Sequence, residues 1–161
     1  MLKTARLRLR NFTPADADKI YEYRNTPECL RYQRYDDTSI EYINDFVERF
    51  ATSAFLSREE EQHYAIADLY TDALIGDLSL FYSESDACFT LGITLAGEHQ
   101  RRGYAYEILD AVISRLEAEY PSFEIVALID RENERSIALF KRLGFVLECY
   151  AESIDSLVFV K

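Results

Sequence analysis

The chain has 161 residues, of which 48% are hydrophobic and 14% aromatic, and its formal net charge is −11. A chain of this size and composition can bury a substantial core, which excludes an intrinsically disordered protein. An acidic surface repels the phosphates of nucleic acids and anionic membranes, so we expect neither as a partner. We predict one domain over residues 1–161.

The cysteines and histidines are too few and too scattered for a disulfide framework or a zinc site. They are Cys29, Cys88, Cys149, His63 and His99. We therefore expect no metal and a reducing compartment. The first ten residues lack the apolar stretch of a signal peptide, and no apolar run is long enough to cross a bilayer, so the expected location is the cytoplasm.

The first third of the chain predicts one strand and two helices. Residues 4–10 alternate arginine with leucine, as a half-buried strand does. Thr13 is a fitting N-cap, with Pro14 at the first helical position, and that helix should run to about Asn25 because Pro27 restricts the residue before it. A second capping signal at 38–41 predicts a helix that continues to about residue 50, with residues 51–61 as its exit.

The middle and end of the chain alternate between strand and helix patterns. Residues 63–70, 74–82 and 88–95 read as an antiparallel meander, and apolar residues from Ala105 to Leu116 follow a helical face. The apolar run 123–129 predicts a strand buried on both faces. A shorter helix around 137–143 should end at Gly144, and 145–150 with 154–160 should form a hairpin. This order predicts a mixed α/β (α+β) fold with a single, mostly antiparallel sheet and helices on both faces.

One segment has the character of an anion site. Residues 95–105 connect a predicted strand to a predicted long helix, whose first backbone N–H groups lack intrahelical partners. Gly103 allows close approach of the backbone, while Arg101 and Arg102 add positive charge in an acidic chain. These features predict a phosphate site. Neither a Walker motif nor a dinucleotide fingerprint is present, and a plain turn with solvated arginines has the same composition.

Two motifs resemble those of the GCN5-related N-acetyltransferases. Residues 100–105 (QRRGYA) are similar to motif A of that family, Gln/Arg-x-x-Gly-x-Gly/Ala. Residues 133–145, with Asn133, Ser136 and Phe140, resemble its second motif, and the order of elements matches along essentially the whole chain. The opening TARLRLR (residues 4–10) is similar to the start of the RimJ/RimL branch.

The resemblance implies acetyl-CoA as acetyl donor, a sheet splayed between 93–95 and 123–129, and a set of cofactor contacts. In the family, the loop at 100–105 wraps the pyrophosphate, the strand end at 93–95 pairs with the pantetheine arm, and Asn133 contacts that arm, unless it is a plain N-cap. The implied cofactor residues are Ile93, Thr94, Leu95, Gln100, Arg101, Arg102, Gly103, Tyr104, Ala105 and Asn133.

The catalytic acid and base are less well indicated. Many relatives have at position 140 a tyrosine that protonates the departing thiolate, but Phe140 has no proton to donate. The resemblance to the RimJ/RimL branch implies Ser136 as the acid instead, and Asp155 in the last hairpin as the base. Glu152 and Glu98 are alternatives for the base, and each of these carboxylates could equally be a solvated surface group.

The acceptor amine is not named by the sequence. The segment between the first two helices combines acidic and aromatic residues, of which Glu28, Tyr32 and Tyr35 are expected to bind substrate. Three readings remain open: acetylation of a protein N-terminus, acetylation of a small cationic amine, and a coenzyme A-binding regulator without catalysis, which the phenylalanine at position 140 favours. Relatives are often homodimers, and a homodimer is compatible with this chain.

Overall fold

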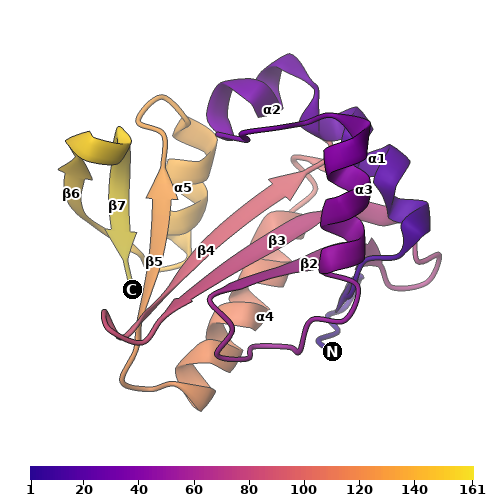
Figure 1. Cartoon of the computed structure of the whole chain (residues 1–161). Helices are drawn as coiled ribbons and strands as arrows, with labels where there is room; N and C mark the ends of the chain where they lie inside the picture. Colours follow the sequence, from indigo (N-terminus) through magenta and orange to yellow (C-terminus); the bar gives the residue numbers. More distant parts are fainter.

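A seven-stranded sheet forms the centre of the computed structural model, which describes residues 1–161 (Figure 1). The strand order is β1-β2-β3-β4-β5-β7-β6, and every neighbouring pair is antiparallel except the parallel pair β4–β5. The strands are β1 (Leu7–Arg10), β2 (Glu61–Asp68), β3 (Leu74–Ser83), β4 (Cys88–Leu95), β5 (Glu124–Ile129), β6 (Val146–Ala151) and β7 (Ser156–Val160). The predicted meander, the closing hairpin and the fold class are confirmed.

Helices cover both faces of the sheet. α1 (Ala17–Arg24), α2 (Pro27–Tyr32) and α3 (Ile40–Arg49) belong to one side, and α4 (Tyr104–Glu119) and α5 (Glu134–Arg142) to the other. Each side has its own core: one cluster of 11 buried residues joins α1 and α3, and a cluster of 23 joins α4 and α5 to the opposite face of the strands. As expected, Gly144 ends α5 with a φ of 90°. No helix is both long and apolar enough to cross a membrane.

Two sequence predictions need correction. The sequence pattern does not predict helix α2, because Pro27 restricts Thr26 and so indicates only the end of the preceding helix. In the structure Pro27 stands at the first position of a new helix, where its missing N–H costs nothing, and Thr26 caps that helix by accepting from the Cys29 N–H at 3.3 Å. The second correction concerns β5, which is buried on one face only; Leu128 is 46% exposed, because no helix covers that side of the strand.

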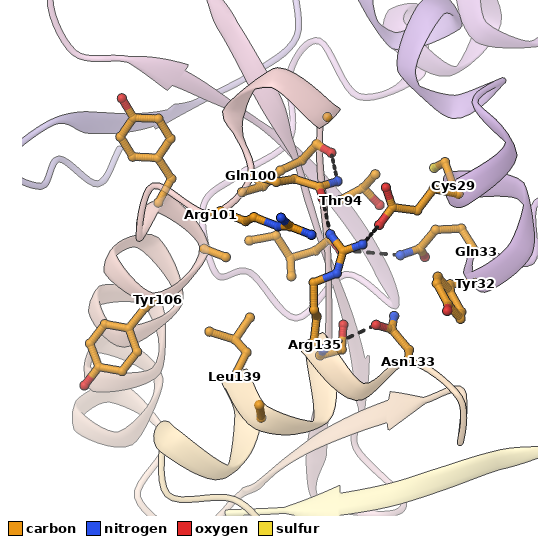
Figure 2. Close-up of a pocket in the computed structure, with 18 of the residues that line it drawn as sticks. Cys29, Tyr32, Gln33, Thr94, Gln100, Arg101, Tyr106, Asn133, Arg135 and Leu139 are labelled. Atoms are coloured by element: carbon orange, nitrogen blue, oxygen red, sulfur yellow. Dashed lines mark hydrogen bonds and ion pairs between the residues drawn. The ribbon is translucent and has the colours of Figure 1, made fainter.

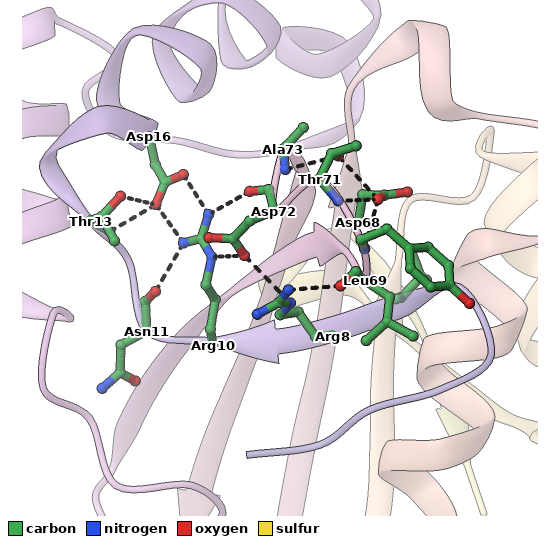
Figure 3. Close-up of polar contacts among 12 residues, drawn as sticks. Arg8, Arg10, Asn11, Thr13, Asp16, Asp68, Leu69, Thr71, Asp72 and Ala73 are labelled. Carbon is green, nitrogen blue, oxygen red and sulfur yellow. Dashed lines mark hydrogen bonds and ion pairs between the residues drawn. The ribbon is translucent and has the colours of Figure 1, made fainter.

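Arginines of β1 fix the start of α1 to the turn between β2 and β3 (Figure 3). The Arg10 guanidinium binds the Asp16 carboxylate in a bidentate pair at 2.7 and 2.9 Å, and its Nε donates to Asp72 at 3.0 Å. The same Asp16 carboxylate accepts from the N–H of Thr13 at 2.7 Å, completing the helix start that the sequence indicated. Burial raises the pKa of Asp16, but the hydrogen bonds from Arg10 and Thr13 outweigh it and lower that pKa overall.

The sheet opens between β4 and β5. β4 pairs with β3 along its whole length, but with β5 over only three residue pairs, Cys88–Thr90 with Glu124–Val126. Beyond Thr90 the two strands diverge, and β5 continues its pairing on the other side with β7. The edge of β4 from Leu91 to Leu95 is thereby left without a strand partner on that side, and such backbone groups need another hydrogen-bonding partner.

Candidate active site

A cavity of about 460 Å³ lies where β4 and β5 diverge. Its walls come from α2, the end of β4, the turn before α4, and one face of α5 (Figure 2). Most of the expected cofactor residues line it: Ile93, Thr94, Leu95, Gln100, Arg101, Gly103, Tyr104, Ala105 and Asn133. Arg102 is exposed and does not line the cavity.

The turn before α4 presents free backbone donors. Arg101 and Gly103 both adopt left-handed conformations, with φ of 61° and 79°, which glycine tolerates and arginine only at a cost. The backbone N–H groups of residues 101–104 donate to no acceptor within the chain. They stand at the N-terminus of a 16-residue helix, where the partial positive charge favours an anion.

The cavity is positively charged although the protein is acidic. Three arginines line it, Arg101, Arg135 and Arg142, against the single carboxylate of Glu28. The surplus of guanidinium groups around free N–H donors suits a ligand with several phosphate charges.

Arg135 crosses the cavity and connects three of its walls (Figure 2). From the first turn of α5 it donates to Gln100 Oε1 at 2.7 Å and pairs with Glu28 Oε1 of α2 at 2.5 Å. Gln100 in turn donates from Nε2 to the Leu95 carbonyl at 3.1 Å. The Gln100 side chain is therefore used to hold the end of β4 rather than being free for a ligand.

The wall formed by residues 26–35, which we call the α2 segment, is held across the opening by charges. Arg31 pairs with Glu132 at 2.9 Å, and Arg34 donates to the Asp155 carbonyl at 2.6 Å and lies 3.8 Å from Asp130. These partners lie after β5 and in the β6–β7 turn, on the far side of the cavity. Exposed ion pairs contribute little free energy each, so this wall is held less firmly than the rest of the site.

Ser136 faces the cavity from the first turn of α5, as the resemblance implies for the acid. Asn133 is the N-cap of that helix, since its Oδ1 accepts from the Ser136 N–H at 3.2 Å. The capping role is therefore observed, and the amide nitrogen of Asn133 is left for a ligand. Phe140, by contrast, is 3% exposed and packs against Phe145 with ring centroids 5.1 Å apart, away from the cavity.

The structure does not bring the three carboxylates considered as bases into the cavity. Asp155 is exposed in the β6–β7 turn, accepts a hydrogen bond from the Tyr150 hydroxyl, and lies 3.6 Å from Arg34. The Tyr150 hydrogen bond lowers the pKa of Asp155, which makes it a weaker base. Glu98 is paired with Lys19, which lowers its pKa likewise, and Glu152 lies beside Asp155 outside the cavity.

The expected substrate residues occupy two different places. Glu28 and Tyr32 line the cavity from α2. Tyr35 lies behind its wall, where its hydroxyl is 3.0 Å from Thr94 Oγ1 and its ring packs under the Arg24 guanidinium at 4.6 Å. Burial raises the pKa of Tyr35, so it is a protonated support for β4 rather than an exposed contact. Cys29 also lines the cavity, and burial raises the pKa of its thiol to about 11.

Sequence reasoning missed the inner face of α5. Arg135, Ala138, Leu139 and Arg142 all line the cavity and follow the i, i+3, i+4, i+7 spacing of one helical face. Leu139 is partly buried against the core and also lines the cavity. Counting three, four and seven residues on from Arg135 along the predicted helix would have found the other members of this face.

Comparison with known proteins agrees with this geometry. The Acetyltransferase (GNAT) domain family matches residues 6–146. An uncharacterized N-acetyltransferase of Bacillus subtilis, YoaA, is 29% identical over 150 residues, covering 92% of this chain and 84% of that protein.

Two solved structures share the fold across nearly the full chain. A putative ribosomal-protein-serine acetyltransferase from Vibrio cholerae superposes with a TM-score of 0.81 at 24% identity, covering 99% of this chain and 95% of the other. The V. cholerae spermidine N-acetyltransferase, solved with CoA and spermine, gives 0.75 at 18%, covering 96% and 92%. With its family match over most of its length, this chain belongs to the GNAT family and is an acetyltransferase.

Proposed function

We propose that the protein transfers the acetyl group of acetyl-CoA to a primary amine. The observation that carries the proposal is the set of unpartnered N–H groups at residues 101–104, next to a β4 edge that lacks a strand partner and opens into a cavity lined by three arginines. A molecule with a pyrophosphate and an amide-containing arm fits both features. A GNAT protein of the same fold, the V. cholerae spermidine N-acetyltransferase, was solved with CoA.

In this proposal different walls of the cavity bind different parts of the coenzyme. The N–H groups of residues 101–104 and the Arg101 guanidinium hold the pyrophosphate. The backbone of residues 93–95 and the amide nitrogen of Asn133 hold the pantetheine arm, which adds to the β4 edge as a strand would. The coenzyme supplies a thioester, whose carbonyl is the electrophile.

The amine attacks the thioester carbonyl directly, the C–S bond breaks, and Ser136 donates its hydroxyl proton to the departing thiolate while the proton that the attacking nitrogen loses returns to the Ser136 oxygen. An acetylated cysteine intermediate is disfavoured, because the one thiol in the cavity, Cys29, has a pKa of about 11 and is therefore protonated near neutral pH. Ser136 lies on the same wall as Asn133, at the N-terminus of α5, where a developing negative charge is stabilised.

The acceptor we favour is an α-amine. An α-amine with a pKa of about 8 loses its proton at pH 7 at a cost of about 1 kcal/mol, whereas a lysine-like amine at about 10.4 costs roughly 4.6 kcal/mol. The sole carboxylate in the cavity, Glu28, is already paired with Arg135, so the site offers no free base to deprotonate a lysine-like amine. An α-amine substrate, such as a protein N-terminus, needs none.

A small cationic amine is the second candidate, and Glu28 is the observation that favours it. If the acceptor displaced Arg135, the Glu28 carboxylate and the Tyr32 ring would form a site for an ammonium group. In that case Glu28→Gln raises the KM for spermidine, and the KM for a peptide is unchanged.

The two candidates are separated by one assay. Acetylation of a short peptide with a free N-terminus and of spermidine is followed by mass spectrometry at saturating acetyl-CoA. We expect the peptide to be acetylated with the larger kcat/KM. Preference for spermidine supports the second candidate, and CoA binding without turnover of any amine supports a regulatory protein and contradicts the proposed function.

A further inference from the structure

Arg6 of the N-terminal segment contacts the turn before α4 from outside the cavity. We call this turn, residues 101–104, the phosphate turn. Its Nη1 donates to the Arg102 carbonyl at 3.0 Å, and its guanidinium lies over the Tyr104 ring at 4.5 Å from the centroid. Its Nε and Nη2 both contact Glu107 Oε2 at 2.7 Å. One side chain thus touches the turn, the first residue of α4 and the first turn of that helix.

The hydrogen bond to the Arg102 carbonyl fixes the direction of a neighbouring donor. In a trans peptide the C=O of one residue and the N–H of the next point in opposite directions. Since the Arg102 carbonyl points to Arg6, the Gly103 N–H points away from Arg6. Gly103 lines the cavity, and its N–H has no acceptor within the chain.

The ion pair with Glu107 removes a charge that would oppose anion binding. Glu107 lies in the first turn of α4, where an uncompensated carboxylate would offset the positive end of the helix. Its side chain is 18% exposed and also accepts from Thr4 Oγ1 at 2.6 Å and from the Arg6 N–H at 2.9 Å. Burial raises the pKa of Glu107, but the hydrogen bonds from Thr4 and Arg6 outweigh it, so the group is charged and neutralised by Arg6.

We propose that Arg6 is a positioning residue for coenzyme binding: it orients the Arg102–Gly103 peptide toward the pyrophosphate and neutralises Glu107. This inference rests on the proposed function. Arg6 touches no reacting atom, so its effect falls on coenzyme affinity and leaves the chemical step unchanged.

The test compares Arg6→Gln with a control on the same strand, Arg8→Gln. Arg8 contacts the Leu69 carbonyl at 2.7 Å and lies 3.5 Å from Asp72, far from the turn. Calorimetric Kd values for CoA and for acetyl-pantetheine, which lacks the pyrophosphate, are measured for both variants, together with kcat at saturating acetyl-CoA. We expect Arg6→Gln to weaken CoA about tenfold, or about 1.4 kcal/mol, with acetyl-pantetheine affinity and kcat within about twofold of wild type.

A second variant separates the two parts of the role. In Arg6→Gln/Glu107→Gln the carboxylate is gone but the Arg102 carbonyl still lacks its donor. We expect partial recovery of CoA affinity.

The outcomes distinguish this inference from the proposed function. Wild-type protein that binds no CoA overturns both. Wild-type binding with Arg6→Gln indistinguishable from Arg8→Gln, or with CoA and acetyl-pantetheine weakened equally, overturns the role of Arg6 alone.

Discussion

Ser136 is the residue on which the proposed chemistry depends most directly. It lines the cavity one helical turn before the buried Phe140, the position at which the family resemblance implies a tyrosine acid. Substituting Ser136→Ala removes a proton donor without touching the phosphate turn, so we expect kcat to fall at least tenfold while the Kd for acetyl-CoA stays within twofold. Steady-state kinetics and calorimetry measure both. Unchanged kcat would remove Ser136 from the mechanism.

Asp155 is the corresponding test for the base. Its carboxylate is exposed, hydrogen-bonded to Tyr150 and outside the cavity, and the Tyr150 hydrogen bond lowers its pKa. With an α-amine acceptor we therefore expect Asp155→Asn to keep kcat/KM within threefold across pH 6 to 9. A fall in kcat/KM above tenfold would instead identify Asp155 as the base.

Individual site residues could be predicted from the sequence where a local pattern indicates them. Gly103 and the turn around it stand out by the change from strand to helix period, and Asn133 by its place before an amphipathic helix. Tyr35 was predicted as a substrate contact, and its role as a support for β4 was missed, because its contacts with Arg24 and Thr94 depend on the packing of α1 against β4. Arg6 has its contact partners about 100 residues away, which no local pattern can indicate.

At the scale of elements, β3 and β4 are packed so closely that a glycine of β3 leaves no space for a side chain. Gly76 of β3 pairs with Leu95, and a Cβ at Gly76 would meet the Thr94 carbonyl oxygen at 2.1 Å. Gly76→Ala must shift the backbone that lines the cavity. We expect a loss of about 1–3 kcal/mol in the free energy of unfolding and weaker CoA binding.

Gly97→Ala is the control for that substitution, since a Cβ there meets no atom within 4 Å. Urea unfolding measures both variants. Equal stability of Gly76→Ala and Gly97→Ala would show that β3 and β4 are not packed as the structure has them.

The elements themselves were largely predictable because their periods are clear. The amphipathic pattern of α4 predicts a helix and the alternation in β1 predicts a strand, as observed, and β4 was predicted over its observed range. Helix α2 was missed because six residues are too few to show a period. Its tertiary support comes from the ion pair of Arg31 with Glu132 and, just after the helix, from hydrogen bonds of Arg34 to the carbonyls of residues 154–155. The one-sided burial of β5 depends on which helices cover it, which its own apolar sequence does not reveal.

For the whole molecule, His63 predicts how stability depends on pH. Its ring lies between Phe46 and Phe50, at 4.9 and 4.5 Å between centroids, and burial lowers its pKa despite the nearby Glu61 and Asp77 carboxylates. An unfolded histidine titrates near 6.5. The stabilisation is therefore present above about pH 6.5 and is lost as the pH falls from there toward the lower folded pKa, because the unfolded chain binds the proton more readily.

Thermal unfolding at pH 7.5 and 5.5 tests this dependence. We expect Tm to fall with pH in the wild type and to fall less in His63→Phe, which keeps the aromatic packing. His99→Gln, whose native side chain is 24% exposed, serves as the control and should behave as wild type. An identical pH dependence in wild type and His63→Phe would contradict the argument.

The central claim, that the opening between β4 and β5 is an acetyl-CoA site, is tested most directly by thermal unfolding with and without acetyl-CoA. At about 100 times the Kd, binding adds about 2.7 kcal/mol to the stability of the folded state. For a chain of this length that corresponds to a rise in Tm of roughly 5 to 11 °C. We expect such a rise in the wild type and its loss in Gly103→Glu, where a carboxylate would stand at a left-handed position inside the phosphate turn. A folded wild-type protein whose Tm does not respond to acetyl-CoA would contradict the claim.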